Sequence, residues 1–150
     1  MIDLAEIRDH LAASVPVLRE VGLAKELGAL RAGAVPWPAA YVVPMSEQAS
    51  DNRYQTDALT DQRVVFRFAV ILAVRDIGTR RGSGAVESLV DIRDPIVNAL
   101  ATFVPTGADT ACIPRQGRLV SGISNDGGLF WQDDFNTAFN RRIIAEGAVE

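Results

Sequence analysis

The stretch QRVVFRFAVILAVRD, residues 62–76, is the clearest single element of the sequence. Apolar residues occupy every second position from Val64 to Val74, which is the period of a β-strand. The positions between them are mixed and include Val65, Arg67, Ala69 and Ile71. We therefore predict one long strand with one face in the core. Its second face should also meet something, either another layer or another subunit.

Upstream, prolines bracket a short apolar run in VPWPAAYVVP, residues 35–44. Proline cannot donate a ladder hydrogen bond, so Pro36 and Pro38 should mark the beginning of a strand over 39–43 and Pro44 its end. The polar stretch at 45–61 has no sustained period and predicts a loop of about 17 residues. Loops of this length are uncommon in compact domains and are usually functional or disordered.

The remaining elements follow from periodicity, caps and chain breakers. Asp3 is the expected N-cap of the first helix, with Glu6 in the capping-box position. Pro95 should kink or divide the last helix. Turns are expected at 78–84 and 125–128, and irregular structure at 106–117. We predict helices over 3–14, 24–31 and 85–103, short strands over 17–22 and 119–123, and a second long strand over 129–144.

Long strands joined by hairpins or by a single helix predict an α+β fold. We expect a mostly antiparallel sheet with two long strands, and helices packed on one face. The 150 residues correspond to a single domain over 1–150. The first residues contain no basic region followed by an apolar core, so no signal peptide is expected. The longest apolar stretch, 68–74, is far shorter than the ~20 residues of a membrane span.

The charge and cysteine content exclude some functions. A net charge of −4 and a pI near 5.0 argue against a nucleic-acid-binding surface as the main function. Cys112 is the one cysteine, so no internal disulfide can form, and no second Cys or His lies near it to suggest zinc. His10 is expected to be a solvated helix residue, because no positioned partner for a general base is evident. A papain-like pair of Cys112 with His10 is the remaining alternative.

Three further motifs have a structural and a functional interpretation. GTRRGSG, residues 78–84, lacks the Lys-Ser/Thr step of a P-loop, so Arg80 and Arg81 belong either to an exposed turn or to an interface. Asp133 and Asp134 could bind one metal ion only across a bulge, because neighbouring strand residues face opposite sides. Trp131 is a core residue or an interface anchor. We predict no catalytic, cofactor-binding or metal-binding residue, and the pattern is typical of a protein that assembles.

The order of these segments resembles the tail terminator, or tail completion, proteins of long-tailed bacteriophages and related prophage and gene-transfer particles. The matching parts are the N-terminal helix, PAAYVVP and its polar sequel, the strand at 62–76, the helix with Arg93-Asp94-Pro95, and GGLFWQDDFNTAFNRRI near the end. The resemblance covers residues 2–145. It implies a non-enzymatic, structural virion protein that forms a hexameric ring at the head-proximal end of the tail tube.

Such a ring stops the addition of tube protein and joins the head connector. The resemblance therefore implies three partners: other copies of the chain, the tail tube protein and the head–tail connector or stopper protein. DNA would only pass through the lumen, no membrane or cofactor would be involved, and assembly would occur in the host cytoplasm. Ring closure needs two different complementary faces on each subunit. Our interface candidates are Val65, Arg67, Ala69, Ile71, Arg80, Arg81, Trp131 and Asp133.

The polar loop suggests a second set of residues. Glu47, Asp51 and Asp57 could face the lumen, where like charge would keep DNA from sticking. Two alternatives remain open at this point. One is a head–tail connector, stopper or neck protein on the head side of the joint. The other is a small ligand-binding α+β domain, which should show a concave apolar pocket with convergent polar groups.

Overall fold

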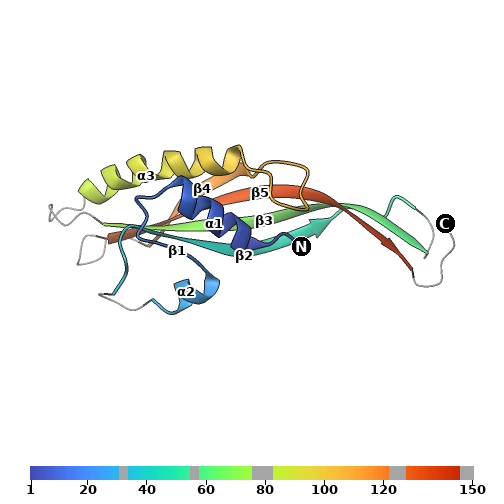
Figure 1. The fold of residues 1–150 in the computed structure, drawn as a ribbon, viewed down its shortest axis with the longest axis horizontal. Helices are drawn as coiled ribbons and strands as arrows, with labels where there is room; N and C mark the ends of the chain where they lie inside the picture. The colour runs from blue at the N-terminus through green and yellow to red at the C-terminus, as the bar shows by residue number, and fades with distance from the viewer. Residues whose placement is uncertain (31–33, 55–57, 76–82, 122–127, 146–150) are drawn as a thin grey trace.

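The structure is a computed structural model that describes residues 1–30, 34–54, 58–75, 83–121 and 128–145. Five strands form one sheet in the order β1-β2-β3-β5-β4, in which only the β1–β2 pair is parallel (Figure 1). The predicted α+β fold with a mostly antiparallel sheet is confirmed. The elements are α1 (Leu4–Ser14), β1 (Glu20–Leu23), α2 (Ala24–Gly28), β2 (Ala39–Ala49), β3 (Leu59–Arg75), α3 (Ser83–Ala101), β4 (Ile113–Ser121) and β5 (Gly128–Ile144).

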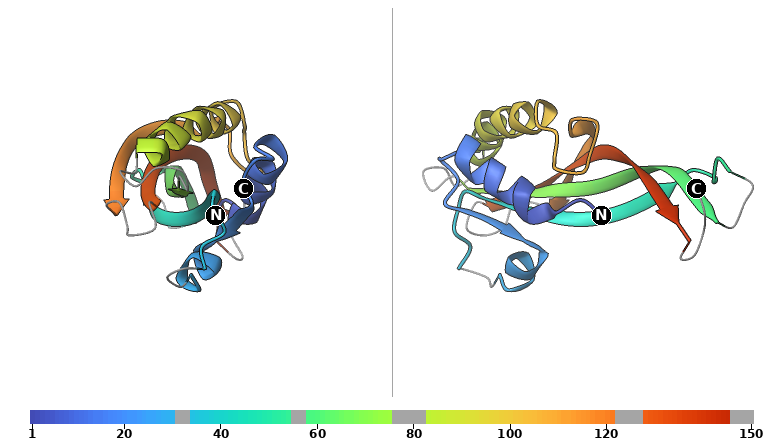
Figure 2. Two further views of the ribbon diagram at one scale, coloured as in Figure 1. Left: turned by 90° about the vertical axis from the view of Figure 1, so that its left-hand side faces the viewer. Right: turned by 45° about the vertical axis from the view of Figure 1, so that its right-hand side comes forward.

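The main core lies between one face of the sheet, here called the front face, and the two longer helices α1 and α3 (Figures 1 and 2). β3 contributes its alternate residues from Phe66 to Val74 to this core, as its period predicts. Helix α3 contributes a stripe at helical spacing that includes Leu89, Ile92, Ile96 and Leu100.

The ends of α1 are fixed by polar contacts. Asp3 is the N-cap, as predicted, and its side chain accepts a hydrogen bond from the Ala5 N–H at 3.0 Å. Glu6 does not close a capping box. It instead accepts hydrogen bonds from the N–H and the hydroxyl of Thr106, at 3.1 and 3.0 Å.

The expectation of a solvated His10 is also wrong, because its ring stacks on Phe103 with centroids 4.0 Å apart.

A second, smaller core occupies part of the opposite face of the sheet, the back face. It contains Trp37, Ala39, Tyr41, Ala69, Ile71 and Ala73, with Leu27, Leu30 and Val35 packed against it. The short helix α2 therefore lies on the opposite side of the sheet from α1 and α3 (Figure 1). The Tyr41 hydroxyl donates a 2.7 Å hydrogen bond to Glu20, and burial raises the pKa of Tyr41.

The predicted loop over 45–61 is wrong at both ends. β2 does not stop at Pro44 but runs on to Ala49, with a register shift between Pro44 and Ser46. β3 begins at Leu59, and a loop remains only between the two strands. A proline in an edge strand can be accommodated at a bulge, where its missing N–H is not needed for the ladder.

Two other expectations change in the second half of the chain. α3 runs unbroken through Pro95, which lies on the exposed side of the helix, where water can bind the carbonyl group one turn earlier. β4 begins at Ile113, inside the segment expected to be irregular. The expected turns at 78–84 and 125–128 fall mostly outside the described residues. None of the helices in the described part of the chain is long and apolar enough to span a membrane.

Candidate assembly surfaces

A three-stranded ribbon projects from the body of the molecule and is its most extended feature (Figure 1). We call it the arm and define it as residues 43–49 of β2, 59–67 of β3 and 137–144 of β5. It forms because the strands outside it are shorter: β1 pairs with β2 only as far as Val42, and β4 pairs with β5 only as far as Asn136. The two outer strands of the arm therefore lack strand partners on one side.

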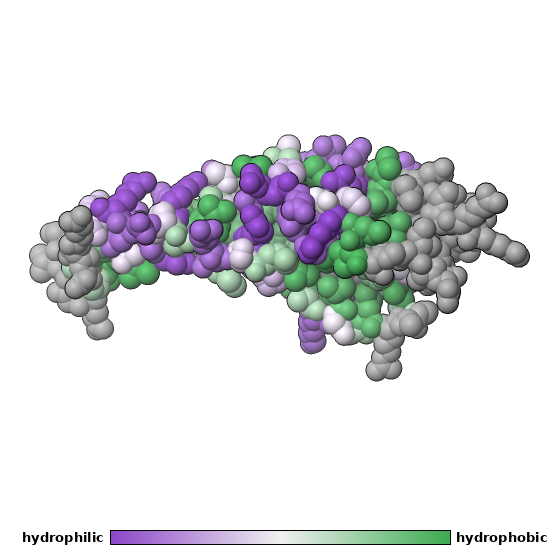
Figure 3. Space-filling model, turned by 180° about the vertical axis from the view of Figure 1, so that it is seen from behind, coloured by the Kyte–Doolittle hydropathy of each residue, from purple (hydrophilic) through white to green (hydrophobic). Residues whose placement is uncertain are grey.

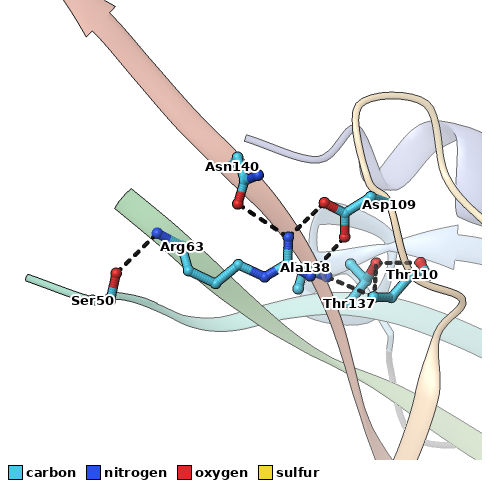
Figure 4. Close-up of polar contacts among 7 residues, drawn as sticks. All are labelled: Ser50, Arg63, Asp109, Thr110, Thr137, Ala138 and Asn140. Atoms are coloured by element: carbon cyan, nitrogen blue, oxygen red, sulfur yellow. Dashed lines mark hydrogen bonds and ion pairs between the residues drawn. The ribbon is translucent and has the colours of Figure 1, made fainter. Parts of the chain in front are cut away.

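The base of the arm is held by Arg63 (Figure 4). Its guanidinium forms a two-pronged ion pair with Asp109 at 2.5 and 2.6 Å and also donates to the side-chain oxygen of Asn140 at 3.1 Å. The Arg63 hydrogen bond lowers the pKa of Asp109, and the pairing raises the pKa of Arg63. The arginine thus connects β3, β5 and the segment before β4.

That segment also covers part of the open edge of β5. The Asp109 N–H donates to the Ala138 carbonyl at 2.9 Å, and the Ala138 N–H donates to the Thr110 hydroxyl at 3.0 Å. The Thr137 hydroxyl in turn donates to the Thr110 carbonyl at 2.9 Å (Figure 4). These bonds satisfy backbone groups of β5 just beyond Asn136, the last residue of β5 that pairs with β4.

A second polar centre joins α3 to the sheet in the body of the molecule. The Arg93 guanidinium binds the carboxylate of Asp133 through Nε at 3.0 Å and Nη2 at 2.9 Å. The Trp131 indole N–H donates to the same carboxylate at 3.1 Å, and Arg93 lies 5.2 Å above the Trp131 ring. Asp133 is buried, and its hydrogen bond raises the pKa of Arg93.

An open hollow of about 150 Å³ lies beside this centre, lined by Arg93, Asp133 and residues 114–117 of β4. Gly117 is required there, because a Cβ atom would lie 2.7 Å from both Arg93 Nη2 and Asp133 Oδ1. The hollow is polar and open, unlike the concave apolar pocket of a typical ligand site. The arrangement is suited to fixing α3 on the sheet rather than to catalysis.

The structure divides the predicted interface residues. Val65 and Arg67 are exposed on the back face of the arm. Ala69 and Ile71, on the same face of the same strand, are 0% and 8% exposed inside the second core. They are covered within the subunit and are not available to a neighbour, so we withdraw them as interface candidates. Trp131 and Asp133 belong to the Arg93 centre, while Arg80 and Arg81 lie outside the described residues.

The predicted lumen residues do not form one loop. Glu47 lies on β2 and pairs with Arg141 of β5 at 2.9 Å, so its charge is already balanced within the arm. Asp51 follows the end of β2 and is exposed. Asp57 lies outside the described residues. Of this set, Asp51 is the described residue whose carboxylate stays free to face a lumen.

His10 and Cys112, the two side chains considered as a possible catalytic pair, both take part in packing the fold. The Nε2 atom of His10 lies 3.0 Å from the Ala99 carbonyl oxygen, so the imidazole links α1 to α3. Cys112 is fully buried, and burial raises the pKa of its thiol to about 12, which opposes formation of a nucleophilic thiolate. Among the described residues, no group of three His, Cys, Asp or Glu side chains could hold a metal ion.

Comparison with known proteins bears directly on this architecture. The family model described as Phage tail terminator protein matches residues 1–146, nearly the whole chain. The chain belongs to the phage tail terminator family. No individual curated protein matches it closely enough to be named as a relative. The match confirms the resemblance seen in the sequence. Membership of the terminator family supports a structural role in the phage tail, as a component of the virion.

The terminator-family segments quoted from the sequence meet in space in a way that their order did not reveal. Arg93-Asp94-Pro95 and the acidic pair at 133–134 are separate motifs in the chain, yet Arg93 and Asp133 form one ion pair. Sequence reasoning also missed Asp109, because the stretch around it shows no period. Its partner Arg63 is one of three arginines on the mixed face of the strand, and this was the available signal.

Proposed function

We propose that this chain caps the tail tube as a hexameric ring, ends polymerisation of the tube and forms the interface to the head. The observation that carries the proposal is the arm, which this subunit projects from its body and whose back face no described residue covers. An isolated subunit gains little from such a ribbon, since sheet segments need a packed face for stability. In a closed ring each arm can pack on the next subunit.

The partners follow from this position at the head-proximal end of the tail. They are further copies of the chain, the tail tube protein and a head–tail connector or stopper protein. DNA would pass through the lumen without specific contacts, and assembly would occur in the host cytoplasm. Charge reversal of Asp51, with Glu47→Gln as a matched variant whose charge is already paired, tests the lumen assignment: DNA ejection should slow only when Asp51 is reversed.

Tail length measured by negative-stain electron microscopy tests the function. Particles assembled without this protein should carry overlong, headless tails, and adding the purified protein should restore length control and head attachment. Tails of normal length beside unattached or leaking heads would instead indicate a connector or neck protein. Wholly normal particles would contradict both roles and favour a ligand-binding function.

A further inference from the structure

The back face of the arm has no covering layer within the described residues. The second core ends near Ala69, and the residues beyond it on this face of β3 and β5 are half-buried or exposed. Val65 on the central strand β3 is 38% exposed, and Ile144 at the end of β5 is 42% exposed. Polar residues dominate the surface of the arm when the molecule is seen from behind (Figure 3). This face is therefore a mixed apolar and polar surface, as interfaces between separately folded proteins are.

The exposed charges of this face are mainly positive. By strand alternation its residues on β3 and β5 include Arg63, Arg67 and Arg142 and one carboxylate, Asp61, which lies directly opposite Arg142 in the ladder. Arg63 is neutralised by Asp109. Among the described residues, Arg67 donates to the uncharged side chain of Asn136, at 3.3 Å, and its charge is not balanced by that contact. Arg142 is exposed at the distal part of the arm.

The outer side of α3 has the opposite charge. Val90, Asp91, Asp94 and Asn98 are exposed along it, and Val90 is 58% exposed. They lie one turn apart or side by side, so they form one continuous surface. Arg93 hydrogen-bonds the buried Asp133 rather than these carboxylates, and its attraction to Asp94 is the weaker one. This side of the helix is thus an acidic surface with an exposed apolar residue.

We infer that the back face of the arm of one copy packs on the outer side of α3 of the next copy. This inference rests on the proposed ring. A ring contact joins two different patches of the same chain, and these two patches are opposite in charge and each contains an exposed valine. They cannot meet within one subunit, because the arm projects at one end of the molecule and α3 lies over the other (Figure 1).

The contact uses side chains rather than strand addition. Several edges are interrupted or occupied: β2 has Pro44 with a register shift after it, β4 has Pro114 with a register shift after it, and residues 109–110 bond to β5 at Ala138. Prolines and bulges disfavour edge-to-edge pairing. A helix packed across the face of the arm avoids this obstacle and covers Val65.

A charge-swap experiment on the full-length protein tests the inference. The arm variant is Arg67→Glu with Arg142→Glu, and the helix variant is Asp91→Lys with Asp94→Lys. Each should lose length control when supplied to particles lacking the protein, because each close charge pair across an interface contributes about tenfold or more in affinity. The protein with all four substitutions should restore normal tail length. Arg19→Glu with Lys25→Glu, two exposed residues that belong neither to the arm nor to α3, is the matched control and should behave like the unmodified protein.

The outcomes separate the two proposals. Failure of the unmodified protein to limit tail length would overturn the proposed function and this inference with it. If the unmodified protein works but the fourfold variant, shown by circular dichroism to be folded, does not recover, the contact between arm and α3 is wrong while the function stands. Full activity of either double variant would also overturn the contact. Oxidation of Arg142→Cys, Asp94→Cys protein on tails should give a ladder of linked copies, and monomers alone would contradict it.

Discussion

The two halves of β3 obey the same alternation and have different surroundings. From Phe68 to Val74 both faces are buried, the front face by α1 and α3 and the back face by the segment around α2. From Leu59 to Arg67 the front face is buried at Val64 and Phe66, and the back face is half-buried or exposed, with no covering layer among the described residues. The chain therefore completes its own packing in the body and leaves it incomplete in the arm. The incomplete half is where a partner can act.

The largest expected effect lies in the front core of the body half. Phe68 is fully buried and stacks on Phe135 with centroids 5.5 Å apart. Phe68→Ala should lower the free energy of unfolding by about 3–5 kcal/mol, because it leaves a cavity between the helices and the sheet. Arg67→Ala, its exposed neighbour, should change it by no more than about 0.5 kcal/mol. Denaturant unfolding followed by circular dichroism measures both, and equal effects would refute the described packing.

The back face of β3 gives a sharper comparison, because it is covered at Ile71 and exposed at Val65. Ile71→Ala should cost about 2–4 kcal/mol, because Ile71 lies in the second core. Val65→Ala should cost less than about 1 kcal/mol in the free protein, because Val65 is 38% exposed. Once the protein is assembled on tails, Val65→Ala should weaken resistance to denaturant more than it does in the free protein. No such difference would argue against an assembly role for this face.

A third test concerns the link between α3 and the body. Arg93→Ala should cost about 2 kcal/mol, because it leaves the buried carboxylate of Asp133 with fewer donors. Asp133→Asn should cost about 1 kcal/mol, since the Arg93 side chain is 39% exposed and can be solvated. Thermal unfolding of the two variants gives the order. A larger loss of stability for Asp133→Asn would contradict this order. It would mean that losing the charge of Asp133 costs more than leaving its buried carboxylate without Arg93.

The smallest effect on stability is expected at the ion pair between Arg63 and Asp109. It should be confined to the arm. Because Arg63 lowers the pKa of Asp109 in the folded state, the stabilisation from this pair is present above the ordinary carboxyl pKa and is lost as the pH falls through the lowered value. Amide exchange in residues 137–140 should therefore be constant between pH 5 and 7, after correction for intrinsic rates, and accelerate below about pH 4.

Asp109→Asn is the matched variant for this pH test. It should show fast exchange in the arm at all pH values, while exchange in residues 68–74 stays slow. Loss of protection in both regions together would mean that the arm and the body unfold as one unit, and the contrast between the two halves of β3 would not extend to stability.

The sequence predicted the element types well and their surroundings poorly. The period of residues 62–76, the cap at Asp3 and the α+β class could be read directly, because they depend on neighbours in the chain. The strand within 45–49 was missed because Ser46, Glu47 and Gln48 at its centre are polar, and a ribbon with exposed faces needs no apolar alternation. Among the candidate interface residues, Val65 and Arg67 are exposed, and their role in an interface stays a prediction. Ala69 and Ile71 are not, although the same pattern led to all four.

What the sequence determined by itself is local: where strands and helices form, which side chains share a face, and, through the order of its segments, the family to which the chain belongs. Only the tertiary structure decided what covers each face. The α2 segment reaches the back of the sheet over 69–73 and no further, and Asp109 reaches Arg63 from 46 residues away. Covering a face depends on contacts between distant segments, and periodicity contains no record of such contacts. The same pattern therefore builds a closed core at one end of a strand and an open surface at the other.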